Sequence, residues 1–501
     1  MTYKKTLKVA SFMATITIIS KILGLFREIF LASIYGASFE LTSFLAASKI
    51  PLTLFDLTLG SVVSSVFIPI YTKISNEQNP KQANLFALSY TNLVLIITSI
   101  TSILGIIFAR PIIAFSLSGA DPQIIELSTN LLKIMFPMII FTGITYTFVG
   151  LLNCNQEFYI TAILSLISNL FIIIFLCFSN NIYGLAVIML LSWALQLIIE
   201  LPWVYKFGFR YKFKLFDPNI KSALNLGLPI LISSWAYPVS SLVNMKMASY
   251  LDNSSAVTYM ELATRLYIVI SGIFAYVISN LSYPYLSKFA YNNLKFGNLI
   301  KIILKSITFI IVPIMIGLIV LAVPIVRLAY ERGNFTNYDS IETGHALIGL
   351  SFAMLAFSYN EALNKIFYAR HKAKIPMVSG IIGTCITILA CFVLPDYFGI
   401  MGLGLSVAIG SIITFLINFY QLRHIWTASK FDYFEFSKIF LAGILMGTTV
   451  YKIESMLVGN FQKVFWPTII GAAEYFILAF IFKINILHEL ISVFRKGPKH
   501  D

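Results

Sequence analysis

The sequence is poor in charge and in long polar stretches. Only 12% of its 501 residues are charged, 58% are hydrophobic, and the mean hydropathy is +0.84. A soluble globular protein of this length is therefore excluded. The longest polar stretches are too short to fold as domains, so the function must reside in the apolar segments. These stretches lie around 72–85, 207–221, 285–299 and 329–342.

Motifs for metals and nucleotides are also missing. The five histidines form no HExxH spacing, and the chain has neither a Walker loop nor GxGxxG. No CxxC pair occurs among the cysteines, which are Cys154, Cys177, Cys385 and Cys391. We therefore expect no metal, no cofactor and no ATPase motor in this chain. The driving force, whether membrane potential or a coupling cation, is left open.

Long apolar runs are what the sequence has instead. Each is about 20 residues or longer, which is enough to cross a hydrocarbon layer of roughly 30 Å as a helix. The pattern predicts an all-α polytopic membrane protein with about fourteen transmembrane helices. Their expected spans are 8–36, 43–71, 86–115, 124–152, 159–179, 183–206, 222–250, 256–283, 300–328, 342–369, 376–395, 399–426, 436–452 and 465–487.

The net charge of +14 follows the expected topology. With both termini in the cytoplasm, the inside loops hold most of the Lys and Arg residues, as in 206–214 and 495–499. The charge is therefore explained by loop placement and anionic headgroups, and no nucleic-acid partner is expected. We predict a multi-pass protein of the bacterial cytoplasmic membrane.

Charges inside the apolar runs are the strongest functional signal. Arg27 and Glu28 lie in the first run with Lys21 about two turns earlier, and Lys49 lies in the second run. A charge near the bilayer centre costs at least ~2.5–3.5 kcal/mol, so such residues usually face a wet cavity. At 100° per residue Lys21 and Glu28 share a stripe that Arg27 flanks. A purely structural ion pair is the alternative.

Further charged residues within the apolar runs could lie either at the membrane interface or in a polar cavity. Asp56, Lys246 and Glu261 lie near expected span ends, where long side chains can reach the interface. Arg265 lies early in the second half of the chain, roughly where Arg27 lies in the first, which suggests a duplicated architecture. Cations from both halves would suit an anionic cargo such as a pyrophosphate-linked lipid.

Several motifs resemble one family over nearly the whole chain. They are SKILGLFREIFLASIYGAS at 20–38, KIPLTL at 49–54, SSVFIPIY at 64–71, ATRL at 263–266, LAYERGNFT at 328–336 and KIFYARHKAKIPM at 365–377. In these the sequence resembles the MurJ/MviN lipid II flippases of the multidrug/oligosaccharidyl-lipid/polysaccharide exporter superfamily. Such a flippase catalyses no covalent chemistry and is not an enzyme.

The resemblance implies two six-helix lobes in a V, with two more helices that form a groove for the lipid tail. The lobes would be 1–206 and 207–430, and the groove, with a cytoplasmic tail, 431–501. It also implies alternating access that moves lipid II, an undecaprenyl-diphosphate disaccharide-pentapeptide, from the inner to the outer leaflet for peptidoglycan biosynthesis and cell shape. Expected partners are this substrate, membrane lipids and the cell-wall synthesis machinery, with the protein as a monomer.

By motif position, the resemblance assigns Arg27, Arg265, Lys21 and Lys49 to a cationic substrate cavity. Secondary candidates are Glu28, Thr42, Phe55, Asp56 and Glu261. Thr42 replaces a usual acid, Phe55 a cavity arginine and Asp56 a basic residue. The lost arginine at Phe55 and the carboxylate gained at Asp56 weaken diphosphate attraction, since a charged contact is worth ~1.5–3 kcal/mol.

Alternative functions stay open at this point. They are a flippase for another polyprenyl-diphosphate glycan, and a multidrug or cation antiporter of the same superfamily, which would favour an acidic cavity. A membrane glycosyltransferase would need catalytic carboxylates or histidines on a larger external loop. We expect LAYERGNFT to form an interfacial turn between two helices, with Gly333 supplying the turn.

Overall fold

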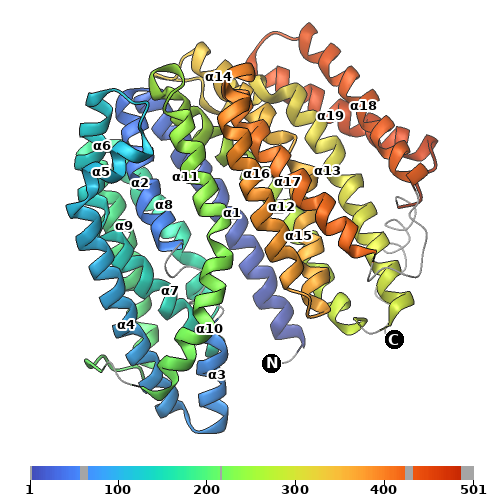
Figure 1. Cartoon of the computed structure of the whole chain (residues 1–501). Helices are drawn as coiled ribbons and strands as arrows, with labels where there is room; N and C mark the ends of the chain where they lie inside the picture. Colours follow the sequence, from blue (N-terminus) through green and yellow to red (C-terminus); the bar gives the residue numbers. More distant parts are fainter. Residues whose placement is uncertain (1–2, 57–65, 215–216, 291, 424–432, 487–501) are drawn as a thin grey trace. The chain divides into compact units, whose positions relative to one another are not determined.

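The computed structural model describes residues 3–56, 66–214, 217–290, 292–423 and 433–486, and these residues are almost entirely helical. Their contacts group into two compact units. The amino-terminal unit contains Met1–Thr258 and Gly333–Phe335, and the carboxy-terminal unit contains Tyr259–Arg332 and Thr336–Asp501. Figure 1 follows the chain through both units from blue to red.

Eleven α-helices and a 3₁₀ helix precede the long helix α12. They are α1 (Tyr3–Tyr35), α2 (Phe39–Phe55), α3 (Ile68–Glu77), α4 (Pro80–Ile107), α5 (Ala109–Ser116), α6 (Pro122–Met135), α7 (Met138–Cys154), α8 (Tyr159–Phe178), α9 (Ile182–Lys206), α10 (Pro218–Ser234), α11 (Ala236–Ala248) and the 3₁₀ helix Asp252–Ser254.

Eight α-helices make up the rest of the described chain. They are α12 (Ser255–Lys288), α13 (Asn293–Tyr330), α14 (Asn337–Ser351), α15 (Met354–Ala369), α16 (Lys374–Phe398), α17 (Ile400–Leu422), α18 (Tyr433–Met456) and α19 (Asn460–Ile481).

Over its described residues, each of the fourteen predicted segments coincides with one helix or with two consecutive helices; residues 57–65, 424–426 and 487 of these segments lie outside the described part of the chain. Among the described residues, eight helices are long and apolar enough to span a membrane, or ten if two bent pairs each count as one span. The segments outside that set are α1, α2 with α3, α10 with α11, and α12. These are the segments that carry Arg27, Lys49, Lys246 and Arg265.

Two pairs of consecutive helices are bent at short breaks. The pair α6 and α7 bends by 42° at Phe136 and Pro137, because the proline ring cannot donate the backbone bond that would continue α6. The pair α14 and α15 bends by the same angle between Ser351 and Met354. By contrast, Pro51, Pro202 and Pro313 lie inside single helices.

The two contact units differ from the lobes that the resemblance implies. The first unit continues past residue 206 and includes α10 and α11, whereas the implied amino-terminal lobe ends there. Helices α18 and α19 group with the second unit. A division into 1–206, 207–430 and 431–501 therefore stays a prediction about functional lobes.

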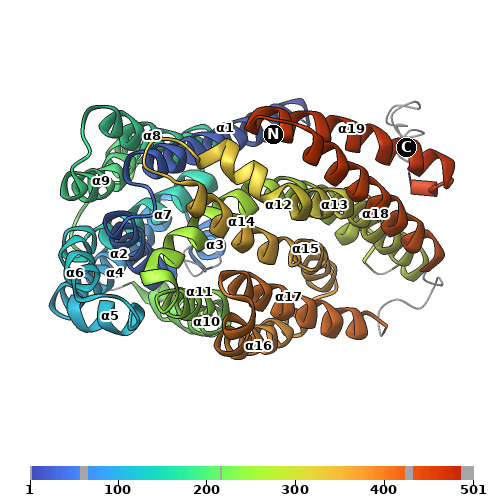
Figure 2. The ribbon, with the colours of Figure 1, turned by 90° about the horizontal axis from the view of Figure 1, so that it is seen from above.

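Helices α18 and α19 pack against α13 through one apolar cluster. Its buried residues include Phe309, Val312, Ile439 and Tyr475, and the Tyr475 hydroxyl donates to the carbonyl of Phe309 over 2.8 Å. Figure 2 shows the three helices running side by side. A buried ion pair between Lys305 of α13 and Glu435 of α18 joins the same helices.

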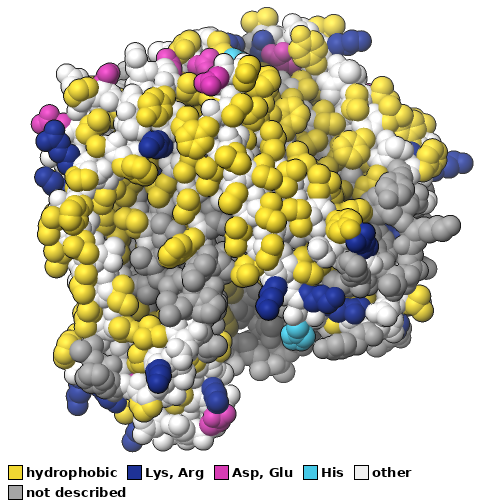
Figure 3. Space-filling view, viewed as in Figure 1, with side chains coloured by type: hydrophobic (Ala, Val, Ile, Leu, Met, Phe, Trp, Pro, Cys, Tyr) yellow, Lys and Arg dark blue, Asp and Glu magenta, His cyan; other side chains and the backbone are white. Residues whose placement is uncertain are grey.

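The surface agrees with a lipid environment. In Figure 3, hydrophobic side chains dominate the middle of the visible face of each unit, and most charged side chains lie toward its two ends. Many large apolar side chains are exposed on the long helices, for example Phe178 at 87% and Phe480 at 65%. In water such a surface would be an aggregation hazard, but lipid is its natural solvent.

Candidate functional site

Arg27 is held by two side chains in the amino-terminal unit. Its guanidinium donates to Glu28 Oε1 over 2.5 Å and to Asn169 Oδ1 over 3.0 Å. Asn169 lies on α8 and donates through Nδ2 to the carbonyl of Ser20 on α1, over 3.3 Å. The amide therefore fixes the arginine and ties α8 to the helix that carries it.

The two charges of this pair differ in their access to solvent. The Arg27 side chain is 16% exposed, whereas Glu28 is only 2% exposed. Glu28 offsets the cost of placing Arg27 in an apolar helix, because a nearly buried guanidinium without a counter-charge would be strongly destabilising. The remaining exposed part of Arg27 is available to an anion. Chemically, the pair is a fixed cation whose carboxylate partner competes with any anionic ligand.

The other predicted cations lie on α1, α2 and α12. Lys21 on α1 and Lys49 on α2 are both half-buried in the amino-terminal unit. Arg265 is exposed on α12 in the carboxy-terminal unit, with the half-buried Glu261 one turn earlier. Among the predicted site residues, the structure therefore brings Arg27 and Glu28 together. Lys21 and Glu28 lie on the same helix, as the expected stripe requires, and Arg27 beside it binds Glu28.

The three positions that depart from the family pattern have different surroundings. Thr42 is buried, and its hydroxyl shares a 2.9 Å hydrogen bond with Thr258. Phe55 is 2% exposed and packs on Tyr146, with ring centroids 5.4 Å apart. Asp56 is exposed at the end of α2. A threonine and a phenylalanine thus fill packed positions, and Asp56 is the one of the three that adds an exposed charge.

The LAYERGNFT segment docks on the end of α1. Gly333 has a φ of +60°, so the turn predicted at this glycine is confirmed. Asn334 donates through its backbone to the carbonyl of Ser33 over 2.9 Å, and through its side chain to the carbonyl of Ile34 over 2.6 Å. These carbonyls belong to the last turn of α1 and have no partner within the helix. The loop 333–335 therefore caps the helix that carries Arg27.

Sequence reasoning missed four polar residues inside apolar helices. Asn169 was detectable as a lone amide in the apolar run YITAILSLISNLFIIIFLCF. Glu200, Lys305 and Glu435 are buried charges at 0%, 5% and 3% exposure. The signal for Glu200 and Lys305 was their position within predicted spans, while Glu435 lies at the edge of one.

Comparison with known proteins assigns the family. The profile of the family "Lipid II flippase MurJ" matches residues 31–471, which is most of the chain. The chain belongs to the MurJ family of lipid II flippases. It is therefore a transporter-family protein and not an enzyme, and the motif resemblance seen in the sequence is confirmed.

Individual MurJ relatives match almost end to end. A probable lipid II flippase MurJ of Buchnera aphidicola (subspecies Acyrthosiphon pisum) is 28% identical and covers 96% of this chain and 97% of its own length. The lipid II flippase MurJ of Thermosipho africanus is 27% identical, with the same two coverages.

Solved structures agree with the MurJ fold. A lipid II flippase MurJ in an inward closed conformation superposes with a TM-score of 0.82 at 26% identity, over 96% of this chain and 99% of that one. An inward-facing MATE multidrug transporter of the MOP superfamily reaches 0.69 at 14% identity, over 82% and 97%. The second likeness concerns the fold alone. Together they confirm an all-helical, multi-pass membrane architecture.

Proposed function

We propose that this chain moves lipid II from the inner to the outer leaflet of the bacterial cytoplasmic membrane. The observation that carries the proposal is the match to the MurJ family profile over residues 31–471. Transport proceeds by alternating access, in which the protein opens to one side of the membrane at a time. No bond of the lipid is made or broken, so the protein contributes binding energy and conformational change.

The diphosphate of the lipid is the group that the basic residues recognise. We assign Arg27, Lys21 and Lys49 of the amino-terminal unit and Arg265 of the carboxy-terminal unit to this role. Arg27 supports the assignment because Glu28 and Asn169 fix its orientation while 16% of its side chain stays exposed. A guanidinium held in this way can meet phosphate oxygens without losing rotamer freedom on binding.

Secondary roles follow from charge. Glu28 pairs with Arg27 when no lipid is bound. The negative charge of Asp56 at the end of α2 lowers the local electrostatic potential for the anionic lipid. Both termini lie in the cytoplasm, as the distribution of basic loops favours. We further propose lobes at 1–206 and 207–430, with 431–501 serving the lipid tail, and a monomer that works beside cell-wall synthases.

Depletion complementation tests the proposal. The chain is expressed in bacteria depleted of their own lipid II flippase, and lipid II exposed on the outer leaflet is measured. We expect growth and exposure to be restored. Normal membrane expression without lipid II exposure would contradict the substrate, and rescue of a different lipid-linked glycan in the same assay would identify the alternative.

A further inference from the structure

Glu200 is a fully buried carboxyl group without a partner. It lies on α9 with 0% exposure, and within the described part of the chain neither of its two carboxyl oxygens has a hydrogen-bond partner. The other buried acids discussed above differ in this respect, since Glu28 accepts from Arg27 and Glu435 from Lys305. A carboxylate in this setting would carry an uncompensated charge in a low-dielectric interior, which is strongly unfavourable.

The surroundings of Glu200 form a polar stripe along one face of α9. Ser192, Gln196 and Glu200 recur every four residues and are 1%, 6% and 0% exposed. Residues four apart share one face of a helix, so this stripe points into the unit and not into lipid. The polar side chains of this face could bind a proton or a water molecule, although all three are buried in this structure.

Other titratable groups do not neutralise Glu200. Helix α9 packs against α2, α6, α7 and α8. Their titratable side chains, with those of α9 itself, are Glu40, Lys49, Glu126, Lys133, Tyr146, Cys154, Tyr159, Cys177, Tyr183, Tyr205 and Lys206. In the structure as described, none of these forms a hydrogen bond with Glu200.

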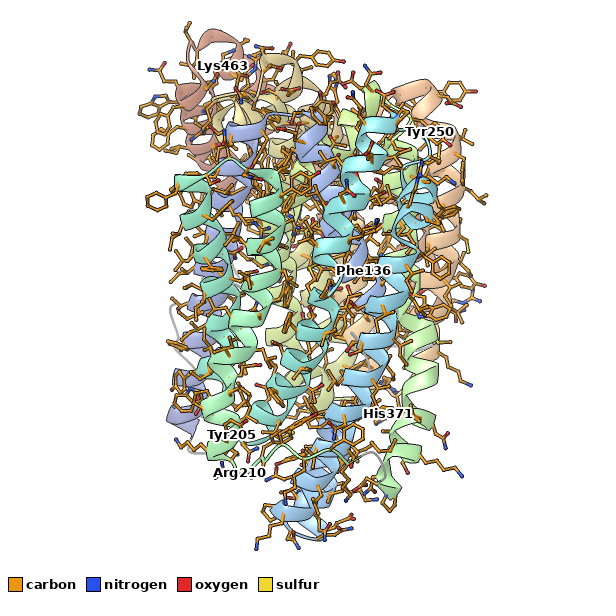
Figure 4. The ribbon with its side chains drawn as sticks, turned by 90° about the vertical axis from the view of Figure 1, so that its left-hand side faces the viewer. Phe136, Tyr205, Arg210, Tyr250, His371 and Lys463 are labelled. Carbon is orange, nitrogen blue, oxygen red and sulfur yellow. The ribbon has the colours of Figure 1, made fainter. Side chains whose placement is uncertain are left out.

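The path for a proton from Glu200 to one end of the amino-terminal unit is short. Glu200 precedes Tyr205 by five residues, or about 7.5 Å along the helix axis. Figure 4 places Tyr205 and Arg210 at one end of the amino-terminal unit, with Tyr250 at the opposite end and Phe136 between them. Pro202 lies inside α9 next to Glu200 and leaves the carbonyl of Ile198 without its helical donor. Helix α9 is therefore weakened where an opening would expose the carboxyl group.

We propose that Glu200 is a proton-binding site of the amino-terminal unit. The carboxyl holds its proton while α9 is packed as observed, and releases it to water at the Tyr205 and Arg210 end when the helices around it separate. The product is a carboxylate that needs hydration, so loss of the proton favours the separated packing and uptake favours the closed one. The ligand is H⁺ itself, and the site differs from the cationic residues assigned to lipid binding.

Infrared spectroscopy of the purified protein in lipid nanodiscs tests this directly. At neutral pH we expect absorption in the carbonyl-stretch region of protonated carboxyl groups. This absorption should be lost in Glu200→Gln, which keeps the side-chain shape, and in Glu200→Met, which keeps its length without polar atoms. The matched control is Glu126→Gln, which removes an exposed carboxyl of the same unit and should leave the absorption unchanged.

Transfer to D₂O then tests exchange. We expect the Glu200 absorption to shift within minutes, because openings that release a proton occur on timescales of microseconds to seconds. Absorption that is absent from the wild type, or that survives both substitutions, would overturn the site. An absorption that never shifts would equally overturn it, since it would mark a permanently neutral structural group. Neither measurement uses lipid II, so these outcomes are independent of the proposed transport function.

Discussion

Arg27 on α1 is bound 3.0 Å from Asn169 on α8, although 142 positions separate the two residues in the sequence. Each residue stands out in the sequence as a polar group in an apolar run, but their pairing does not. Since the same amide also binds the carbonyl of Ser20, one side chain sets both the arginine and the spacing of two helices.

Asn169→Ala should reduce flipping while leaving most of the fold intact. A hydrogen bond to a charged group is worth ~1.5–3 kcal/mol, so we expect a loss of roughly ten- to hundred-fold in the flipping rate at low lipid II. The measurement is lipid II flipping in proteoliposomes. In a double-mutant cycle, Asn169→Ala should cost little more once Arg27 has been replaced by alanine, because the contact between the two side chains is then already lost.

A matched control distinguishes the loss of a positioning contact to Arg27 from a general loss of packing. Asn92→Ala removes another buried amide of the same unit, one that binds loop carbonyls of Lys212 and Lys214. This substitution should lower the thermal stability of the protein without a specific loss of flipping rate at low lipid II concentration. Equal flipping profiles for the Asn92 and Asn169 variants would refute a positioning role for Asn169.

Arg27→Ala and Arg265→Ala should each abolish flipping without preventing membrane insertion. Arg27→Lys should restore little, because an ammonium cannot present the planar fork that meets Glu28, Asn169 and a phosphate together. Complementation and outer-leaflet lipid II report the result. Arg110→Ala, an exposed arginine on α5 outside the proposed binding residues, serves as the control and should retain wild-type exposure. Wild-type transport by either alanine variant would remove that arginine from the site.

Gly333→Ala should destabilise the docked loop. An added Cβ would lie 2.2 Å from the carbonyl oxygen of Ser33, and the left-handed backbone costs a non-glycine residue about 1–2 kcal/mol even without that clash. We expect a lower melting temperature in detergent. Gly317→Ala on α13 is the control, because a Cβ there meets nothing within 4 Å and alanine favours the helix by about 0.5–1 kcal/mol. If both variants melt like the wild type, the capping of α1 by the loop contributes no stability.

Removing one partner of the Lys305 and Glu435 pair should be costly. An uncompensated buried charge typically destabilises by ~3–5 kcal/mol, so Glu435→Leu should lower the melting temperature strongly. It would also leave the backbone N–H of Ile486 without its acceptor, which lies 3.2 Å away on Glu435. The double variant Lys305→Met with Glu435→Leu should recover much of the loss. A double variant less stable than either single one would contradict this expectation, because the loss could not then come from one uncompensated buried charge.

Sequence alone determined the class of protein and the positions of most helices. Apolar runs of membrane length and breakers such as Pro137 act locally, so their effect can be read without knowing the neighbours of a segment. The motifs around Arg27, Arg265 and LAYERGNFT likewise led to the correct family. Gly333 was predictable as a turn, because glycine tolerates the left-handed backbone that a turn requires.

Tertiary structure alone decided which polar groups meet. Helix periodicity placed Arg27 beside the stripe of Lys21 and Glu28, but only the packing of α8 against α1 brings Asn169 to the guanidinium of Arg27. The burial of Glu200 and the pairing of Lys305 with Glu435 also depend on which helices pack together. Such contacts join residues more than a hundred positions apart, and hydropathy along the chain carries no information on them.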